Sequence, residues 1–231
     1  MKLYATRLLA PLFAVALLAG CGSEDAPAPA PTSAIDAPPD IPVMGQEVPI
    51  VAIGDSLFTG YGLDNGISYP AKLEAALRAK GINARIANAG VSGDTTAGGA
   101  QRLAFTLDSQ QAKPDLVIIS LGGNDMLRGL PPEQTRANLD AMLAELKQRG
   151  IRAVLLGMLA APNLGKDYAD AFNPIYPALA KKYDAALVPF FLQPLMDRPD
   201  LVQDDRIHPT EAGIEALVAE TADKVAGALP K

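Results

Sequence analysis

Cysteine, histidine and tryptophan are almost absent from this sequence, whose 231 residues include one Cys, one His and no Trp. One cysteine cannot form an internal disulfide, and one histidine cannot supply the several His or Cys ligands of a usual zinc site. Basic residues are also in the minority. The net charge of -6, from 20 Lys and Arg against 26 Asp and Glu, is the wrong sign for binding nucleic acid through its phosphates. The sequence therefore predicts no nucleic-acid partner and a chemistry that uses no metal or other cofactor.

Two common motifs are also missing. Without Gly-Lys-Ser or Gly-Lys-Thr, nothing supports a P-loop, and without Gly-x-Ser-x-Gly, nothing supports the α/β-hydrolase fold. Hydrophobic residues make up 49% of the chain and charged residues 20%, which is typical of a globular protein and not of a disordered or multi-pass membrane protein. No feature indicates an obligate protein partner.

The N-terminus has the layout of a secretory signal. Lys2 and Arg7 precede an apolar run from Leu8 to Leu18, which is too short to span a bilayer stably. Leu18-Ala19-Gly20-Cys21 resembles the lipobox of bacterial lipoproteins, which implies that residues 1–20 are removed and that Cys21 is lipidated. The alternative is a plain signal peptide that leaves Cys21 as a free thiol, a liability in an oxidising compartment.

The segment 21–47 is rich in Pro, Ala and acidic residues and has almost no large apolar side chains. Such a segment favours an extended tether, which at about 3.1 Å per residue reaches roughly 80 Å. We therefore expect an exported protein, lipid-anchored to a bacterial membrane and facing the periplasm or the cell exterior. Gly22 after the cysteine favours the outer membrane if the cell is Gram-negative, an expectation that rests on lipoprotein resemblance. The globular domain is expected over 48–231.

Beyond the tether, short apolar β-rich runs alternate with amphipathic runs, the pattern of parallel strands joined by helices in an α/β fold. Strands are predicted at Ile50–Gly54, Arg85–Asn88, Leu116–Leu121, Ala153–Met158 and Ala186–Phe190. Helices are predicted from Pro131 or Pro132 to Gly150, with Leu139, Met142, Leu143 and Leu146 on one face, and from Pro209 or Thr210 to about Ala228.

Ligands of an open parallel sheet bind beyond the carboxyl ends of its strands, and four blocks of polar residues lie there. The first is Gly54-Asp55-Ser56-Leu57, where the glycine allows a sharp turn and Ser56 is exposed as a nucleophile, or Asp55 and Ser56 merely cap a helix. The second is the loop from Asn88 to Thr96, whose free N–H groups could meet an anion, or in which Ser92 or Asp94 is an N-cap.

The third block, Leu121-Gly122-Gly123-Asn124-Asp125, offers close backbone approach and an amide donor, although alone it could be a turn. The fourth, Asp204-Asp205-Arg206-Ile207-His208-Pro209, places a carboxylate three residues before the only imidazole of the chain. An isolated histidine is usually an ordinary residue. Here three other blocks supply a serine and two oxyanion donors at the same sheet edge, which favours a catalytic site.

Together the four blocks resemble the GDSL, or SGNH, hydrolase family, named for Ser, Gly, Asn and His in such blocks. The segments Gly122 to Gly129, Ile175-Tyr176-Pro177 and Val188-Pro189-Phe190-Phe191 are similar to its bacterial arylesterase group, which includes a multifunctional acyl-CoA thioesterase and lysophospholipase. The resemblance implies a flavodoxin-like three-layer α/β/α sandwich with about five parallel strands in the order 2-1-3-4-5.

The resemblance also implies residue roles. Ser56 would attack an acyl carbonyl, His208 would take its proton, and Asp205 would orient the imidazole, with Asp204 as a rival that the family spacing disfavours. The oxyanion would be held by the backbone N–H groups of Ser56 and Gly93 and by the side-chain amide of Asn124.

We therefore predict a serine esterase or thioesterase whose partner is a small-molecule acyl ester or thioester. A carbohydrate or cell-envelope O-deacetylase is an alternative enzyme, and a non-catalytic binding lipoprotein is an alternative from another class. The apolar segment Met158–Leu164 either walls an acyl pocket or packs against a neighbouring loop.

Overall fold

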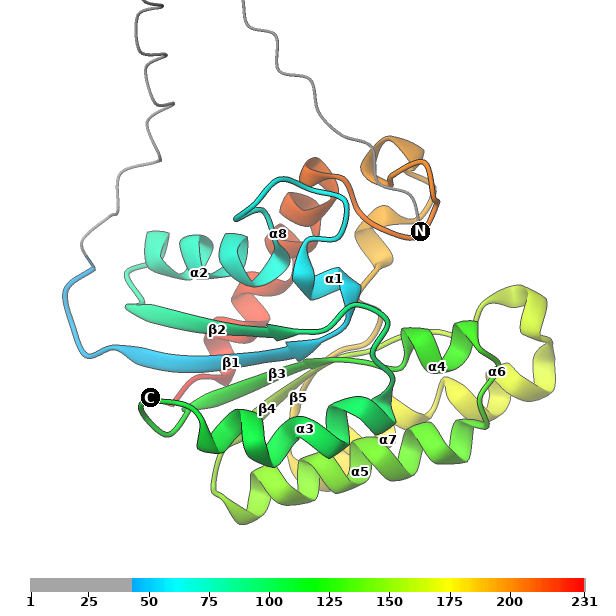
Figure 1. Cartoon of the computed structure of the whole chain (residues 1–231), viewed down its shortest axis with the longest axis horizontal. Coiled ribbons are helices and arrows are strands. Elements are labelled where there is room, and N and C mark those ends of the chain that lie inside the picture. The colour runs from blue at the N-terminus through cyan, green and yellow to red at the C-terminus, as the bar shows by residue number, and fades with distance from the viewer. Residues whose placement is uncertain (1–42, 231) are drawn as a thin grey trace, which may run out of the picture. The chain divides into compact units, whose positions relative to one another are not determined.

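The computed structural model describes residues 43–230, and within them a five-stranded, all-parallel sheet lies at the centre (Figure 1). The strand order is β2-β1-β3-β4-β5, which confirms the order expected from the sequence. The strands are β1 Val48–Gly54, β2 Ala84–Gly90, β3 Leu116–Ser120, β4 Arg152–Leu156 and β5 Ala186–Val188.

Helices cover both faces of the sheet, which makes the predicted three-layer α/β/α sandwich (Figure 1). Helices α2 and α8 pack on one face, and α3, α5 and α7 pack on the other. The helices are α1 Ser56–Thr59, α2 Tyr69–Ala79, α3 Thr96–Asp108, α4 Gly123–Leu127, α5 Pro132–Gln148, α6 Lys166–Phe172, α7 Ile175–Tyr183 and α8 Glu211–Ala228. Three short 3₁₀ turns, η1 Pro162–Leu164, η2 Gln193–Leu195 and η3 Pro199–Leu201, lie in the connections.

The apolar pattern of the sequence explains which surfaces are buried. All five residues of β3 are buried, as expected for a strand covered on both faces. On α5 the predicted stripe of Leu139, Met142, Leu143 and Leu146 is buried, which confirms its orientation toward the core. Helix α8 is joined to α2 by a hydrogen bond of 2.7 Å between the buried hydroxyls of Tyr69 and Thr221.

Several predicted strand ends lie one or two residues too far along the chain, and the last has a clear physical cause. Strand β5 ends at Val188 instead of Phe190 because Pro189 has no N–H to donate to the ladder. Two residues after Pro189, the Phe191 N–H donates to the carbonyl of Gly157, the residue that follows β4, at 2.8 Å. Strands β3 and β4 end at Ser120 and Leu156. The third polar block follows β3, and the apolar segment 158–164 follows β4.

The register of the sheet brings three strand ends to one place. Gly54, at the end of β1, is paired with Gly90 of β2 and with Ser120 of β3. The chain passes from β1 to β2 on one side and returns to β3 on the other, so the topological switch point lies between β1 and β3. Residues that follow these two strands therefore face the crevice where open α/β sheets bind ligands.

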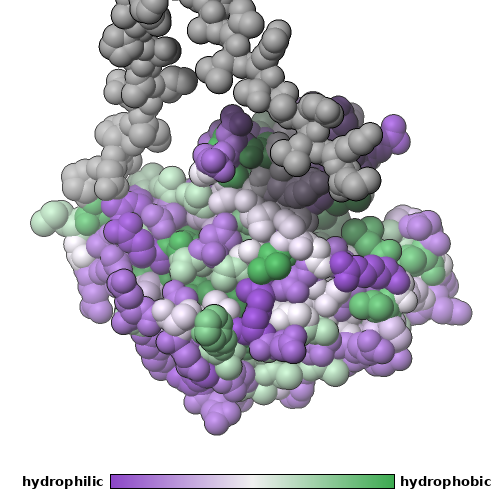
Figure 2. Space-filling view, in the orientation of Figure 1, coloured by the Kyte–Doolittle hydropathy of each residue, from purple (hydrophilic) through white to green (hydrophobic). Residues whose placement is uncertain are grey.

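Hydrophilic residues cover most of the face seen in Figure 2, with hydrophobic residues in small separate patches. Within residues 43–230, no helix is both long enough and apolar enough to cross a membrane. The predicted signal peptide, the predicted lipidation site Cys21 and most of the predicted tether fall outside the described residues.

Candidate active site

Ser56, His208 and Asp205 form one chain of hydrogen bonds at the carboxyl edge of the sheet. Ser56 Oγ lies 2.7 Å from His208 Nε2, and His208 Nδ1 lies 2.5 Å from Asp205 Oδ2. An ionised carboxylate can only accept, so Nδ1 carries the proton and Nε2 is left to accept from the serine hydroxyl. This is the arrangement of a nucleophile, a base and an orienting acid.

The histidine loop holds Asp205 in its ionised form. Its Oδ1 accepts from the backbone N–H groups of Ile207 and His208, both at 2.9 Å. The hydrogen bond from the His208 side chain, with these two backbone bonds, lowers the pKa of Asp205 to about 2. The rival, Asp204, is exposed, and it is Asp205 that contacts the imidazole.

At the first block the sequence left two roles open, helix capping and an exposed serine, and the structure gives each to a different residue. Asp55 is the N-cap of α1 and accepts from the Leu57 N–H at 3.0 Å, whereas the Ser56 hydroxyl is directed at His208. Gly54 is needed for a different reason than the predicted sharp turn. Its φ is not positive, but a Cβ there would lie 2.5 Å from the ring of Phe58, so the glycine permits close packing.

Asp55 is a buried carboxyl directly before Ser56 in the chain, with 2% of its surface exposed. Burial is the largest influence on this group and raises its pKa to about 6, against the hydrogen bond from Leu57 and the attraction of His208. The carboxyl also accepts from Asn124 Nδ2 at 3.3 Å. Asp55 therefore links the nucleophile turn to the third block.

Asn124 and Gly93 line the same cavity as Ser56, at the sheet edge where the sequence predicts them. Asn124 Nδ2 donates to the Asp94 carbonyl at 3.0 Å, so this amide joins the second block as well as Asp55. Arg128 Nη2 donates to the Gly93 carbonyl at 2.8 Å and fixes that loop against α4. Ser56 is the first residue of α1, so its own N–H lies ahead of the intrahelical hydrogen bonds. Helix α3 is capped by Thr95, not by Ser92 or Asp94.

The turn before Asn124 depends on a glycine. Gly122 has φ +110°, and a Cβ there would lie 2.1 Å from the hydroxyl of Tyr176, which donates to the Leu121 carbonyl at 2.9 Å. A larger residue would break this packing and shift Asn124.

Asp125 secures the same turn from beneath. It is buried and accepts from the Thr96 N–H at 2.8 Å and from the Thr135 hydroxyl at 3.1 Å. The Thr96 hydroxyl is a further donor to this carboxylate. Asp125 therefore holds the starts of α3, α4 and α5 together.

A second polar crosslink ties β1 to the loop after β2. Arg102 of α3 forms a salt bridge of 2.7 Å with Asp94 and donates to the Gly54 carbonyl at 3.1 Å. The sequence assigned no role to Arg102 or Arg128, and it placed Asp125 in the third block without a role. Asp125 lies in the block that follows a predicted buried strand, and a carboxylate that is buried there must be paired.

A cavity of about 450 Å³ opens beside the serine. Ser56, Gly93, Asn124 and His208 form its polar end. Its apolar wall is made by Tyr61, Met126, Leu127, Met158, Leu192 and Ile207. The two alternatives for the segment 158–164 both apply: Met158 lines the cavity, and the Ala160 N–H donates to Asn173 at 2.8 Å. Within residues 43–230, no three His, Cys, Asp or Glu side chains are grouped as metal ligands.

Residues 52–216 match the GDSL-like lipase/acylhydrolase family, and the chain belongs to this family. It is a serine ester hydrolase, as its relatives show. The arylesterase of Vibrio mimicus is 41% identical over 160 residues, which cover 69% of this chain and 79% of that protein. Thioesterase 1/protease 1/lysophospholipase L1 of Escherichia coli is 38% identical over 160 residues, 69% of this chain and 74% of that protein.

Among solved structures, this chain is similar to AlinE4, described as an SGNH-hydrolase family esterase. The two are 62% identical, with a TM-score of 0.69 and coverage of 81% of this chain and 100% of the other. The expected family and fold are thus confirmed.

Proposed function

We propose that Ser56 is the nucleophile of this hydrolase and that it acts on acyl esters and thioesters through an acyl-enzyme. The observation that carries the proposal is the Ser56–His208–Asp205 hydrogen-bond chain at the polar end of an apolar cavity. Relatives named arylesterase and thioesterase/lysophospholipase support the substrate class.

In the first half-reaction, Ser56 Oγ attacks the acyl carbonyl while its proton passes to His208 Nε2. Asp205, ionised above pH about 2, stabilises the resulting imidazolium. The imidazolium then gives the proton to the leaving alkoxide or thiolate, and the acyl group stays on Ser56. In the second half-reaction, water gives a proton to His208 and attacks the acyl-serine, which releases the acid and returns the proton to Ser56.

The negative oxygen of each tetrahedral intermediate is held by the N–H groups of Ser56 and Gly93 and the amide of Asn124. In the free enzyme this amide donates to Asp94 at 3.0 Å and to Asp55 at 3.3 Å. The oxyanion therefore has to share or replace one of these bonds, and the longer bond to Asp55 is the weaker competitor.

Labelling with a fluorophosphonate tests the nucleophile, because only an activated serine reacts at a useful rate. We expect the wild type to be labelled, Ser56→Ala to be unlabelled, and Ser92→Ala to be labelled as a control, since Ser92 lines the same cavity. Labelling that survives in Ser56→Ala, or a wild type that is neither labelled nor active, would overturn the assignment.

The acyl preference is tested by p-nitrophenyl esters from acetyl to palmitoyl. The chain length with the highest kcat/KM measures how much of the apolar cavity of about 450 Å³ the acyl group fills. Activity on no ester of the series would contradict the proposed substrate class, and activity confined to acetylated sugars would indicate the O-deacetylase.

The proposal extends to the location of the enzyme: residues 1–20 are a signal peptide, Cys21 is lipidated, residues 21–47 are a tether, and 48–231 are the catalytic domain outside the inner membrane. Its support is the charge, apolar run and lipobox-like Leu18–Cys21 segment of the sequence. Metabolic labelling with an alkyne fatty acid should tag the wild type but not Cys21→Ala, which should leave the membrane fraction. A wild type without label would refute the anchor.

A further inference from the structure

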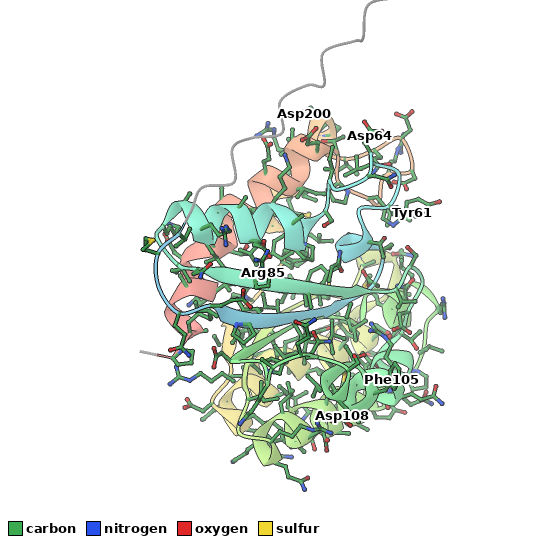
Figure 3. The ribbon with its side chains drawn as sticks, turned by 60° about the vertical axis from the view of Figure 1, so that its left-hand side comes forward. Tyr61, Asp64, Arg85, Phe105, Asp108 and Asp200 are labelled. Atoms are coloured by element: carbon green, nitrogen blue, oxygen red, sulfur yellow. The ribbon has the colours of Figure 1, made fainter. Side chains whose placement is uncertain are left out.

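Tyr61 lies against the proposed base. It belongs to the loop between α1 and α2, at the end of the molecule toward which the strands point (Figure 3). The centroids of its ring and of the His208 imidazole are 4.4 Å apart, and the two planes are tilted by 33°. Tyr61 is 52% exposed, so its ring is not there to fill the core.

Hydrogen bonds hold the backbone of Tyr61 to the histidine loop. Gln203 Nε2 donates to the carbonyls of Tyr61 and Pro209, both at 2.8 Å. The backbone N–H of Gln203 donates to the His208 carbonyl at 2.7 Å. The ring contact is therefore built on a fixed support, although the loops of Tyr61 and His208 are far apart in sequence.

The imidazole needs a contact of this kind. Its two hydrogen bonds, to Ser56 and to Asp205, leave from the two nitrogen atoms and run roughly along one axis of the ring. Two bonds along one axis do not prevent the ring from rocking about that axis, whereas an aromatic surface against the ring face does. That surface also favours the positive charge which the imidazole gains during attack, together with the carboxylates of Asp205 and Asp55.

We infer that Tyr61 is a positioning residue for His208, acting through its aromatic ring and not through its hydroxyl. This inference rests on the proposed function, because it gives Tyr61 a role only if His208 is the base. The ring is the part of Tyr61 that contacts the imidazole.

The first test compares Tyr61→Phe, which keeps the ring, with Tyr61→Leu and Tyr61→Met, which do not. A cation–π contact is worth about 0.5–2 kcal/mol, or roughly 2- to 30-fold in rate. We expect kcat on p-nitrophenyl acetate to fall by about tenfold in the Leu and Met variants and to stay within about threefold of wild type in Tyr61→Phe. Phe105→Leu is the matched control, since Phe105 is 77% exposed on α3, well away from Tyr61 in Figure 3.

Because Tyr61 also lines the cavity, the kinetic constants must separate positioning from substrate contact. Positioning predicts an equal loss of kcat on acetyl and octanoyl esters with little change in KM. A loss found only in KM, or one that grows with acyl length, would instead make Tyr61 a substrate-binding residue and overturn the inference. So would a full-activity Tyr61→Leu, or a Tyr61→Phe as impaired as Tyr61→Leu.

The second test is independent of turnover. The chain has one histidine, so isotope-labelled histidine gives NMR signals from His208 alone. We expect its ring-proton signals to move in Tyr61→Leu, where the neighbouring ring current is lost, and to stay near their wild-type positions in Tyr61→Phe. Unmoved signals in Tyr61→Leu would refute the contact. Failure of the proposed function would be distinct, because Ser56→Ala would then remain labelled, or the wild type would be neither labelled nor active.

Discussion

The strand-end turn that carries Asp55 and the loop that carries Asp205 present two carboxyls to one site in opposite environments. Asp55 is 2% exposed, and burial raises its pKa to about 6. The Asp205 side chain is 37% exposed, and hydrogen bonds from His208 and its neighbours lower its pKa to about 2. The pKa difference therefore has two causes: burial raises the pKa of Asp55, and the hydrogen bond from the His208 side chain is the largest influence that lowers the pKa of Asp205.

This difference assigns separate duties to the two regions. The exposed carboxylate stays ionised at any pH near neutrality and can serve the imidazole throughout turnover. The buried carboxyl has a pKa of about 6 and accepts a hydrogen bond from the amide of Asn124, so it contacts the side of the site proposed to hold the oxyanion.

The largest effect is expected when the Ser56–His208 hydrogen bond, which joins the strand-end turn to the histidine loop, is removed. Ser56→Ala and His208→Ala should each lower kcat by at least about 10⁴-fold, because nucleophile and base act as one unit. For the same reason the double variant should be little worse than either single variant. Steady-state hydrolysis of p-nitrophenyl acetate measures this, and multiplicative losses in the double variant would show that the residues act separately.

Next in size is the loss of the exposed carboxylate. Asp205→Asn should lower kcat by about 10² to 10⁴-fold, because the amide no longer favours the useful imidazole tautomer or its charged form. Asp204→Asn, one residue earlier and exposed, should stay within about threefold of wild type. Equal losses in the two variants would argue against the assignment of Asp205.

On the oxyanion side, Asn124→Ala should keep the fold and lower kcat by about 10² to 10³-fold. Thermal unfolding alongside kinetics separates a lost donor from a damaged loop, since Asn124 also bonds to Asp94. A loss below about tenfold would remove Asn124 from the oxyanion hole.

The smallest expected effect concerns stability and tests Asp55. Below pH 3.8 this carboxyl is protonated in the folded and unfolded states, and above about 6 it is charged in both, so its burial cost develops between these values. Wild type should therefore lose stability relative to Asp55→Asn as pH rises through this window. A pKa raised by about two units sets a ceiling of about 3 kcal/mol.

Urea unfolding of the wild type and of Asp55→Asn at pH 4 and pH 7 measures the difference in their free energy of unfolding. The stability that Asp55→Asn gains over wild type at pH 7 should be below this ceiling, because its amide group faces Asn124 Nδ2 where the carboxylate accepted a hydrogen bond. A difference that is constant with pH would contradict the influence of burial on Asp55.

The gathering of Ser56, Gly93, Asn124 and His208 was predictable from sequence, because parallel strands end at one edge and polar residues follow them there. The sheet order came from the resemblance to the GDSL family. The end of β5 before Pro189 was also available from the sequence, since proline cannot continue a ladder. Burial of Asp55, the Arg102 crosslink and the contact of the Tyr61 ring with His208 were not, because these depend on the paths of loops in space.

Ser56 and His208 are 152 residues apart in the chain, and their hydrogen bond closes only when the first and last parts of the domain are both in place. During synthesis Ser56 is made long before His208, the proposed base. If His208 is that base, a growing chain cannot hydrolyse esters, and truncation before His208 removes the base entirely. In a refolding experiment, the rate at which activity returns therefore reports when the Ser56–His208 contact forms, one of the longest-range contacts in the fold.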